Sequence, residues 1–297
     1  MWNTGFVGNE FAEAARSWQV DGFALVPGLV PVDEIDAAAS DLAVLYGTNT
    51  FDDYNRAAGF GDGDPAGKQF RASQFDGMRG FPMRGCAALN TLFVHPRLVA
   101  FARSALADDD LRIYQAAVWA KWAGVVNYEQ PLHQDGNHSL VPPRMEPGFW
   151  HLEAFLYLSD VDEGCAPPRL VPRSQSHIAH EDLYQHEIVA TGQRGTLLAY
   201  RSDVWHRGTD FARPDASRSV LVIGFRPAAA EWFSYDAFGR LGESRSFAAF
   251  VRGKSPEDLA LFGIPRPGHS YWNEATIDAM SCKYPGLDLS PWRAALS

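Results

Sequence analysis

From residue 111 onward, the chain is a succession of short apolar segments separated by turns. These segments cover residues 111–122, 150–158, 169–171, 195–200 and 219–225. No long helical pattern stands between them, whereas consecutive strands of a parallel sheet need a helical crossover. We therefore predict a mainly β fold with flanking helices, built on an antiparallel sandwich or jelly roll of roughly 115 residues.

Helical patterns dominate the chain before this β region. We expect helices over residues 10–19 and 96–107, a strand over Phe23–Val26, and a further helix that begins near Pro31. Residues 47–85 lack periodicity, and such a long stretch in a compact protein is typical of a functional loop, here a candidate lid.

The domain organisation follows from these patterns. No internal repeat or linker divides the 297 residues, so we predict a single domain over residues 1–297. Residues 1–110 would form a helical part with the lid loop, residues 111–226 the jelly-roll core, and residues 227–297 a C-terminal extension with a short helix at its end.

The charge and hydropathy of the chain argue against several partners. Its formal net charge of −10 disfavours binding to the phosphate backbone of nucleic acids. No apolar run approaches the roughly 18 residues of a membrane span. Glu10, Glu13 and Arg16 interrupt any early apolar core of a secretory signal. We expect a cytoplasmic protein that binds neither nucleic acid nor membrane.

Three cysteines, Cys86, Cys165 and Cys282, show no CxxC spacing. This pattern favours reduced thiols in the core over disulfides or a zinc–thiolate site.

The segment His133-Gln134-Asp135 and the later His206 carry the chemistry. In an extended segment, residues two apart point to the same side, so the His133 imidazole and the Asp135 carboxylate can bind one ion. His206 lies 73 residues beyond His133, just after the strand expected at 195–200. Two histidines and one carboxylate form the facial set of non-haem Fe(II) oxygenases, which leaves positions on the metal open. We predict an iron site here.

Arg218 is the second candidate functional residue. Of the 26 basic residues 22 are arginines, so an isolated arginine carries little weight in this chain. Arg218, however, stands twelve residues after His206 and opens the last predicted strand. Its planar guanidinium matches a carboxylate, such as the distal one of 2-oxoglutarate, with two parallel donors, and Thr209 could add a hydroxyl donor.

The chain resembles the phytanoyl-CoA dioxygenase family of Fe(II)/2-oxoglutarate-dependent oxygenases, which includes ectoine hydroxylases and bacterial hydroxylases of small metabolites. The resemblance extends in order over residues 10–226, and its motifs are densest in segments 114–121, 133–135, 160–165, 171–177, 195–200 and 206–218. It implies a double-stranded β-helix, the cupin-like jelly roll. It also implies that His133, Asp135 and His206 bind iron and that Arg218 binds 2-oxoglutarate.

Further roles are implied by the same resemblance. Thr209 matches a Ser or Thr nine residues before the arginine, and Gln134 matches a glutamine beside the iron ligands. Gln115 matches an inner position of the sheet that meets substrate or cosubstrate, and Phe155 an aromatic near the cosubstrate. The implied reaction uses O2 and 2-oxoglutarate to hydroxylate an unactivated C–H bond of a small molecule, with release of succinate and CO2. Asp135 favours hydroxylation, since related halogenases replace this carboxylate with a small residue.

Other functions stay open at this point. The same cofactors also support desaturation, epoxidation or cyclisation of a natural-product intermediate. A zinc-dependent hydrolase could use the same three ligands around a metal-bound water, but it has no use for Arg218 and Thr209. A third possibility is a β-sandwich that binds a ligand without catalysis.

The basic residues at the end of the candidate lid have two interpretations. Residues 67–85 contain four basic side chains, Lys68, Arg71, Arg79 and Arg84, against the single acidic residue Asp76. In a lid, this excess would favour an anionic substrate, but hydrated loop charges account for it equally well.

Overall fold

The computed structural model describes residues 10–46, 77–124, 129–135, 140, 146, 150–236 and 238–296. Most of the candidate lid, residues 47–76, lies outside the described residues. The end of that stretch, expected to be loop, contains the short strand β2 (Met78–Gly80), which pairs with the strand β3 (Leu111–Trp122). Three residues are too few for a strand to show its alternation in the sequence.

Two antiparallel sheets form the centre of the protein. The larger sheet has the strand order β1-β7-β4-β9-β3-β2, and the smaller one the order β6-β5-β8. Besides β2, the larger sheet contains β1 (Phe23–Val26), β3 (Leu111–Trp122), β4 (Leu152–Tyr157), β7 (Leu197–Tyr200) and β9 (Ser217–Pro227). The smaller sheet contains β5 (Arg169–Leu170), β6 (Ile188–Val189) and β8 (His206–Arg207). The pairing confirms the mainly β, antiparallel prediction.

Each strand of the larger sheet presents alternate residues to two different environments. On β9, Leu221, Ile223 and Phe225 are fully buried in the hydrophobic cluster that the helices share. Val220 and Val222 belong to a separate cluster on the other face of the sheet, together with residues of the smaller sheet such as Leu170. The helices therefore cover one face, and the second face is directed toward the smaller sheet.

Four helices from the first part of the chain bury their apolar faces in the first cluster. They are α1 (Ala12–Asp21), α2 (Val32–Tyr46), α5 (Ala87–Leu92) and α6 (Pro96–Leu106). A proline at the first position of α6 suits the helix start, where its missing N–H has no helical partner. Gly22 ends α1 with φ +87°, and a Cβ there would lie 2.3 Å from Cγ2 of Val204. The chain turns here into β1 because only glycine fits.

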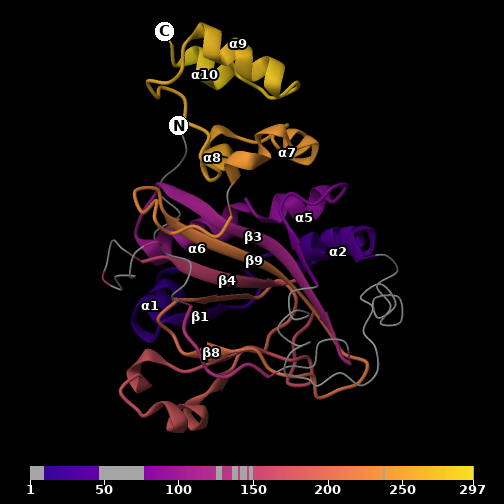
Figure 1. The fold of residues 1–297 in the computed structure, drawn as a ribbon, viewed down its shortest axis with the longest axis vertical. Helices are drawn as coiled ribbons and strands as arrows, with labels where there is room; N and C mark the ends of the chain where they lie inside the picture. The colour runs from indigo at the N-terminus through magenta and orange to yellow at the C-terminus, as the bar shows by residue number, and fades with distance from the viewer. Residues whose placement is uncertain are drawn as a thin grey trace.

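The C-terminal extension is more helical than its mixed sequence pattern indicates. It contains η3 (Phe238–Glu243), α7 (Arg245–Phe250), α8 (Pro256–Ala260), α9 (Glu274–Lys283) and α10 (Ser290–Ala294). Phe250, Ile277 and Trp292 belong to the same buried cluster as the first four helices. In Figure 1, α9 and α10 lie at the end of the molecule opposite to β8. The extension therefore contributes packing at a distance from the smaller sheet.

The three cysteines are free thiols. Cys86 and Cys165 are buried as expected, but Cys282 is exposed, so the prediction of a core thiol is wrong at this position. Helix α9 buries Ile277, and a residue five positions later projects from a different side of the helix. Across the described parts of the chain, no helix has both the length and the apolar character that a membrane crossing requires.

Candidate active site

Two chain segments meet to form the centre of the site. The backbone N–H of His133 donates to the carbonyl of His206 at 3.0 Å, and the N–H of His206 donates back to the carbonyl of His133 at 2.9 Å. Three residues earlier, the N–H of Gln130 donates to the carbonyl of Gly208 at 3.0 Å, and its side-chain Oε1 accepts from the Gly208 N–H at 2.7 Å. This short antiparallel ladder fixes the two histidines side by side.

The three predicted metal ligands lie within reach of one ion. Their ligand atoms are all within 4.8 Å of one another. Nε2 of His206 is 3.2 Å from Oδ2 of Asp135, and Nε2 of His133 is 3.9 Å from Oδ1 of the same carboxylate. Within the described ranges, no other group of three such side chains comes together in this way.

Both imidazoles are oriented by the same local hydrogen bond. Nδ1 of His133 lies 2.9 Å from the carbonyl of Pro131, and Nδ1 of His206 lies 2.9 Å from the carbonyl of Val204. Because a carbonyl only accepts, each Nδ1 carries the proton, which leaves the Nε2 lone pair free for a metal.

The electrostatics of the triad also suit a divalent cation. Burial, together with the neighbouring His206, lowers the pKa of His133, so this imidazole is neutral near pH 7 as metal binding requires. Burial also lowers the pKa of His206, but the hydrogen bond and charge of Asp135 outweigh it and the pKa is raised. A metal ion would take the place of the proton that His206 and Asp135 otherwise share.

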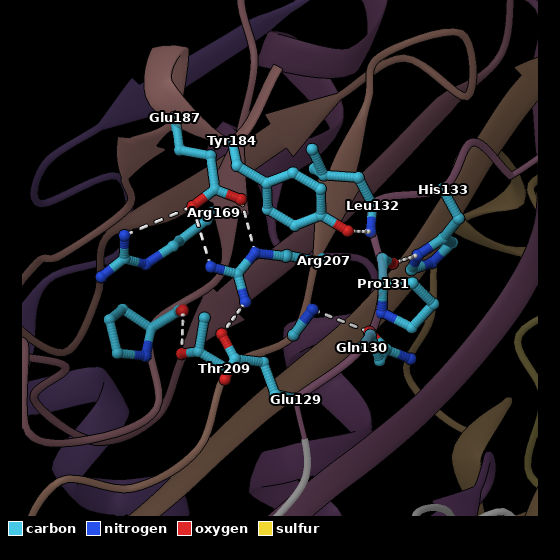
Figure 2. Close-up of polar contacts among 12 residues, drawn as sticks. Glu129, Gln130, Pro131, Leu132, His133, Arg169, Tyr184, Glu187, Arg207 and Thr209 are labelled. Carbon is cyan, nitrogen blue, oxygen red and sulfur yellow. Dashed lines mark hydrogen bonds and ion pairs between the residues drawn. The ribbon is translucent and has the colours of Figure 1, made fainter. Parts of the chain in front are cut away.

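An ion-pair network centred on the buried side chains of Arg207 and Glu187 lies next to the triad. Arg207, next to His206, pairs with Glu187, at 2.9 Å for Nη2, and with Glu129. The Tyr184 ring lies 5.4 Å from the Arg207 guanidinium, and its hydroxyl accepts from the N–H of Leu132, the neighbour of His133, at 3.2 Å. Figure 2 shows these contacts joining both ligand-bearing segments. The sequence did not reveal this network because its members are scattered along the chain.

The triad opens into a cavity of about 400 Å³ between the two sheets. Its lining includes the residues His133, Asp135, Gln115, Phe155, His206 and Arg218, all of them predicted site residues. The His133 side chain is 34% exposed, whereas the His206 side chain is only 10% exposed. The triad is therefore more accessible from the side of His133.

Two buried cations stand side by side in this cavity. Lys121 on β3 pairs directly with Arg218 on β9, and both residues line the cavity and are almost fully buried. Arg218 donates from Nη1 to the Ala166 carbonyl, while its buried Nε has no hydrogen-bond partner among the described residues. Burial lowers the pKa of Arg218 to about 10, and burial and the neighbouring Arg218 hold that of Lys121 well below its ordinary value.

Buried charges of one sign are costly unless an opposite charge compensates them. In the described parts of the chain, no carboxylate forms an ion pair with Lys121 or Arg218, and the charge of Asp210 offsets the effect of Arg218 on Lys121 only in part. The pair therefore fits the distal carboxylate of 2-oxoglutarate. Lys121 was missed at the sequence level, because its position opposite Arg218 depends on the strand register.

Two of the predicted residues do not line the cavity. Gln134 is exposed and donates from Nε2 to the carbonyl of Asp203 at 2.6 Å, which ties the segment of His133 to the one before His206. Thr209 is buried, and its hydroxyl donates to the carbonyl of Pro167 at 2.7 Å. Its proton is therefore used within the protein, and a direct contact of Thr209 or Gln134 with the cosubstrate stays a prediction.

A cavity with two histidines and one carboxylate, set between the sheets of an antiparallel jelly roll, defines a non-haem iron centre. The family model for phytanoyl-CoA dioxygenase matches residues 18–218. The chain belongs to the phytanoyl-CoA dioxygenase family and is thus a 2-oxoglutarate-dependent non-haem iron dioxygenase. Its cofactors are iron and 2-oxoglutarate. No curated protein matches the chain by sequence.

Solved structures show the same fold at low sequence identity. The epimerase SnoN from nogalamycin biosynthesis has a TM-score of 0.54 at 17% identity, over 73% of this chain and 82% of SnoN. EctD from S. alaskensis has a TM-score of 0.55 at 16% identity, over 80% and 84% of the two chains. HygX from Streptomyces hygroscopicus, solved with nickel and 2-oxoglutarate, has a TM-score of 0.51 at 15% identity, over 73% and 86%. The predicted double-stranded β-helix is confirmed.

Proposed function

We propose that this enzyme hydroxylates an unactivated C–H bond of a small-molecule metabolite and converts 2-oxoglutarate and O2 to succinate and CO2. One observation carries the proposal: the two-histidine, one-carboxylate cluster shares its cavity with the buried pair Lys121 and Arg218. A hydrolytic zinc site has no use for the two buried cations, and a passive binding site has no use for the complete triad of metal ligands.

Each part of the cavity has a defined task in this reaction. His133, Asp135 and His206 would hold iron through the two Nε2 atoms and a carboxylate oxygen. Bound iron, with 2-oxoglutarate and O2, supplies the oxidising power that breaks the C–H bond. Arg218 and Lys121 would bind the distal carboxylate and set the direction of the cosubstrate. The apolar side chains of the cavity wall, Trp119, Phe155 and Val222, exclude water from the reacting centre.

Asp135 supports hydroxylation over halogenation, since its carboxylate occupies the position that a halide would need. A second candidate is desaturation, epoxidation or cyclisation with the same cofactors. Among these, cyclisation is favoured by the similarity in fold to SnoK, a carbocyclase from nogalamycin biosynthesis, which has a TM-score of 0.50 at 16% identity.

Labelled oxygen separates hydroxylation from desaturation and cyclisation, and silylation, which derivatises a new hydroxyl group but not an epoxide, separates it from epoxidation. The Fe(II)-loaded enzyme is incubated with 2-oxoglutarate, ¹⁸O2 and a small-molecule extract, and the extract is compared by mass spectrometry with and without enzyme. We expect a product that gains one labelled oxygen atom, with one succinate formed per product. A product that has only lost two hydrogens, or that keeps the mass of its substrate, would contradict hydroxylation.

A further inference from the structure

The cavity has two chemically different ends. Arg218 and Gly224 lie on the same side of β9, six residues apart, which is about 20 Å along a strand. Beside Arg218 stands Lys121, whereas the row of residues through Gly224 contains Gln115 on β3 and Glu153 on β4. The cavity therefore has a cationic end beside Arg218 and a second end, beside Gly224, that carries a buried carboxylate.

Glu153 is built into the second end by specific features of the sheet. Its side chain lines the cavity, and the residue is only 2% exposed. The hydroxyl of Tyr114 donates to Oε1 of Glu153. Tyr114 reaches this position because β3 has a register shift between Ile113 and Gln115. Gly224 leaves room for the ring, since a Cβ there would lie 2.5 Å from Cζ of Tyr114.

This end of the cavity presents hydrogen-bond acceptors. Tyr200, paired with Glu153 across the strands, donates its hydroxyl to Oδ2 of Asp135 at 3.4 Å. Burial and the neighbouring Glu153 keep the pKa of Tyr114 well above its ordinary value, so its hydroxyl stays a donor. Since each phenolic proton is directed to a carboxylate, the ligand faces carboxylate oxygens that can accept further hydrogen bonds.

We infer that Glu153 anchors the substrate and that the substrate carries a protonated amino group. The inference rests on the proposed function, in which 2-oxoglutarate occupies the cationic end and leaves the Glu153 end to the substrate. A charge-assisted hydrogen bond from an ammonium group offsets the cost of burying the carboxylate, whereas a substrate carboxylate would be repelled.

This assignment differs from the anionic substrate that the basic stretch 67–85 suggested. Of its four basic residues, only Arg79 and Arg84 lie within the described ranges. Neither belongs to the cavity lining, and the Arg79 guanidinium lies 5.3 Å from the Tyr46 ring. The basic stretch therefore contributes no described charge to the wall of the cavity.

The test uses four probes that share one ring and differ in the head group: benzylamine, N-acetylbenzylamine, benzyl alcohol and benzoate. Binding to the full chain loaded with Zn(II) and 2-oxoglutarate is measured at neutral pH by saturation-transfer NMR, since Zn(II) keeps the sample diamagnetic. The isosteric change Glu153→Gln removes the charge. Glu163→Gln, at an exposed glutamate, is the matched control.

We expect benzylamine to bind the unmodified protein at least about tenfold more tightly than the other three probes, the size of one charge-assisted hydrogen bond. Glu153→Gln should abolish this preference, and Glu163→Gln should retain it. Tyr114→Phe, which removes the donor to Glu153, should change the preference by a smaller factor. Equal binding of the alcohol or benzoate, undiminished amine binding in Glu153→Gln, or no amine binding would overturn the inference.

A separate measurement distinguishes failure of this inference from failure of the proposed function. The visible charge-transfer band of the anaerobic Fe(II)/2-oxoglutarate complex reports the triad and the cationic end, and it does not depend on substrate. A band in the unmodified protein without an amine preference rejects the role of Glu153 alone. Absence of the band rejects the oxygenase assignment itself.

Discussion

The two faces of the larger sheet are made by alternate residues of the same strands, but they serve different purposes. On β9, the face toward the helices consists of Leu221, Ile223 and Phe225, which are fully buried among other apolar side chains. The opposite face begins with the buried cation Arg218 and continues with Val222 in the cavity wall. One face stabilises the fold, and the other holds charges that a ligand must compensate. Substitutions on the two faces should therefore separate stability from catalysis.

The largest effect is expected for Arg218→Met on the cavity face. Loss of a buried, hydrogen-bonded charge partner costs about 2–5 kcal/mol of binding, or roughly 30- to several thousandfold. We expect this increase in the KM for 2-oxoglutarate, measured by succinate formation. The melting temperature should not fall, because removal of an uncompensated buried charge does not destabilise the protein without its ligand. A normal KM would show that Arg218 does not bind the cosubstrate.

The converse change on the helix face is Ile223→Ala. A truncated buried isoleucine leaves a cavity, so we expect a loss of about 2–5 kcal/mol in the free energy of unfolding, measured by urea denaturation. The KM for 2-oxoglutarate should be unchanged at temperatures where the variant is folded. Val222→Ala, one residue along on the cavity face, should cost less stability because its side chain already borders open space. If Ile223→Ala altered the KM more than Arg218→Met, the division between the two faces would be wrong.

An intermediate effect is expected in the network next to the triad. Glu187→Gln weakens the buried pair with Arg207 without removing any metal ligand. Outer partners of metal sites typically contribute 10- to 100-fold to metal affinity or activity. We expect a loss of this size in Fe(II) affinity, measured by competition with a chelator. Glu163→Gln is again the matched control, and equal affinities of the two variants would show that the network does not position the triad.

The smallest effect concerns pH. Burial and the neighbouring Arg218 lower the pKa of Lys121, and a bound carboxylate would raise it again. The affinity for 2-oxoglutarate should therefore be highest at pH values below the pKa of Lys121 in the free protein. It should weaken as the pH rises through that pKa, by at most about tenfold per pH unit for one proton. Calorimetric titrations should show proton uptake on binding, and Lys121→Met should remove the pH dependence. If the affinity for 2-oxoglutarate still fell with rising pH in this variant, the proton would belong to another group.

The sequence predicted those features whose signal lies within short stretches of chain. The strands β3, β4, β7 and β9 contain apolar runs long enough to be located, and His133, Asp135 and His206 occur in local motifs that the structure brings together. By contrast, β5, β6 and β8 have only two residues each, so periodicity predicted a strand only at 169–171. Side chains that act in pairs across neighbouring strands could not be identified from the sequence either.

Lys121 and Glu153 illustrate this second limit. Lys121 was identified as a site residue because it lies opposite Arg218, 97 residues later in the chain. Glu153 was identified because it lies beside Gly224, 71 residues later. Register is decided by the packing of whole strands, which no local pattern contains. The exposed site of Cys282 and the internal hydrogen bond of Thr209 likewise depend on tertiary contacts.

The central claim is that His133, Asp135 and His206 bind iron in a cavity that also binds 2-oxoglutarate. The most direct measurement is the visible absorption spectrum of the protein with Fe(II) and 2-oxoglutarate under anaerobic conditions. We predict a weak charge-transfer band that is lost in His133→Ala and in Asp135→Ala and is retained in His177→Ala, at an exposed histidine outside the triad. Absence of the band from the folded, metal-loaded protein, or its persistence in both triad variants, would contradict the account.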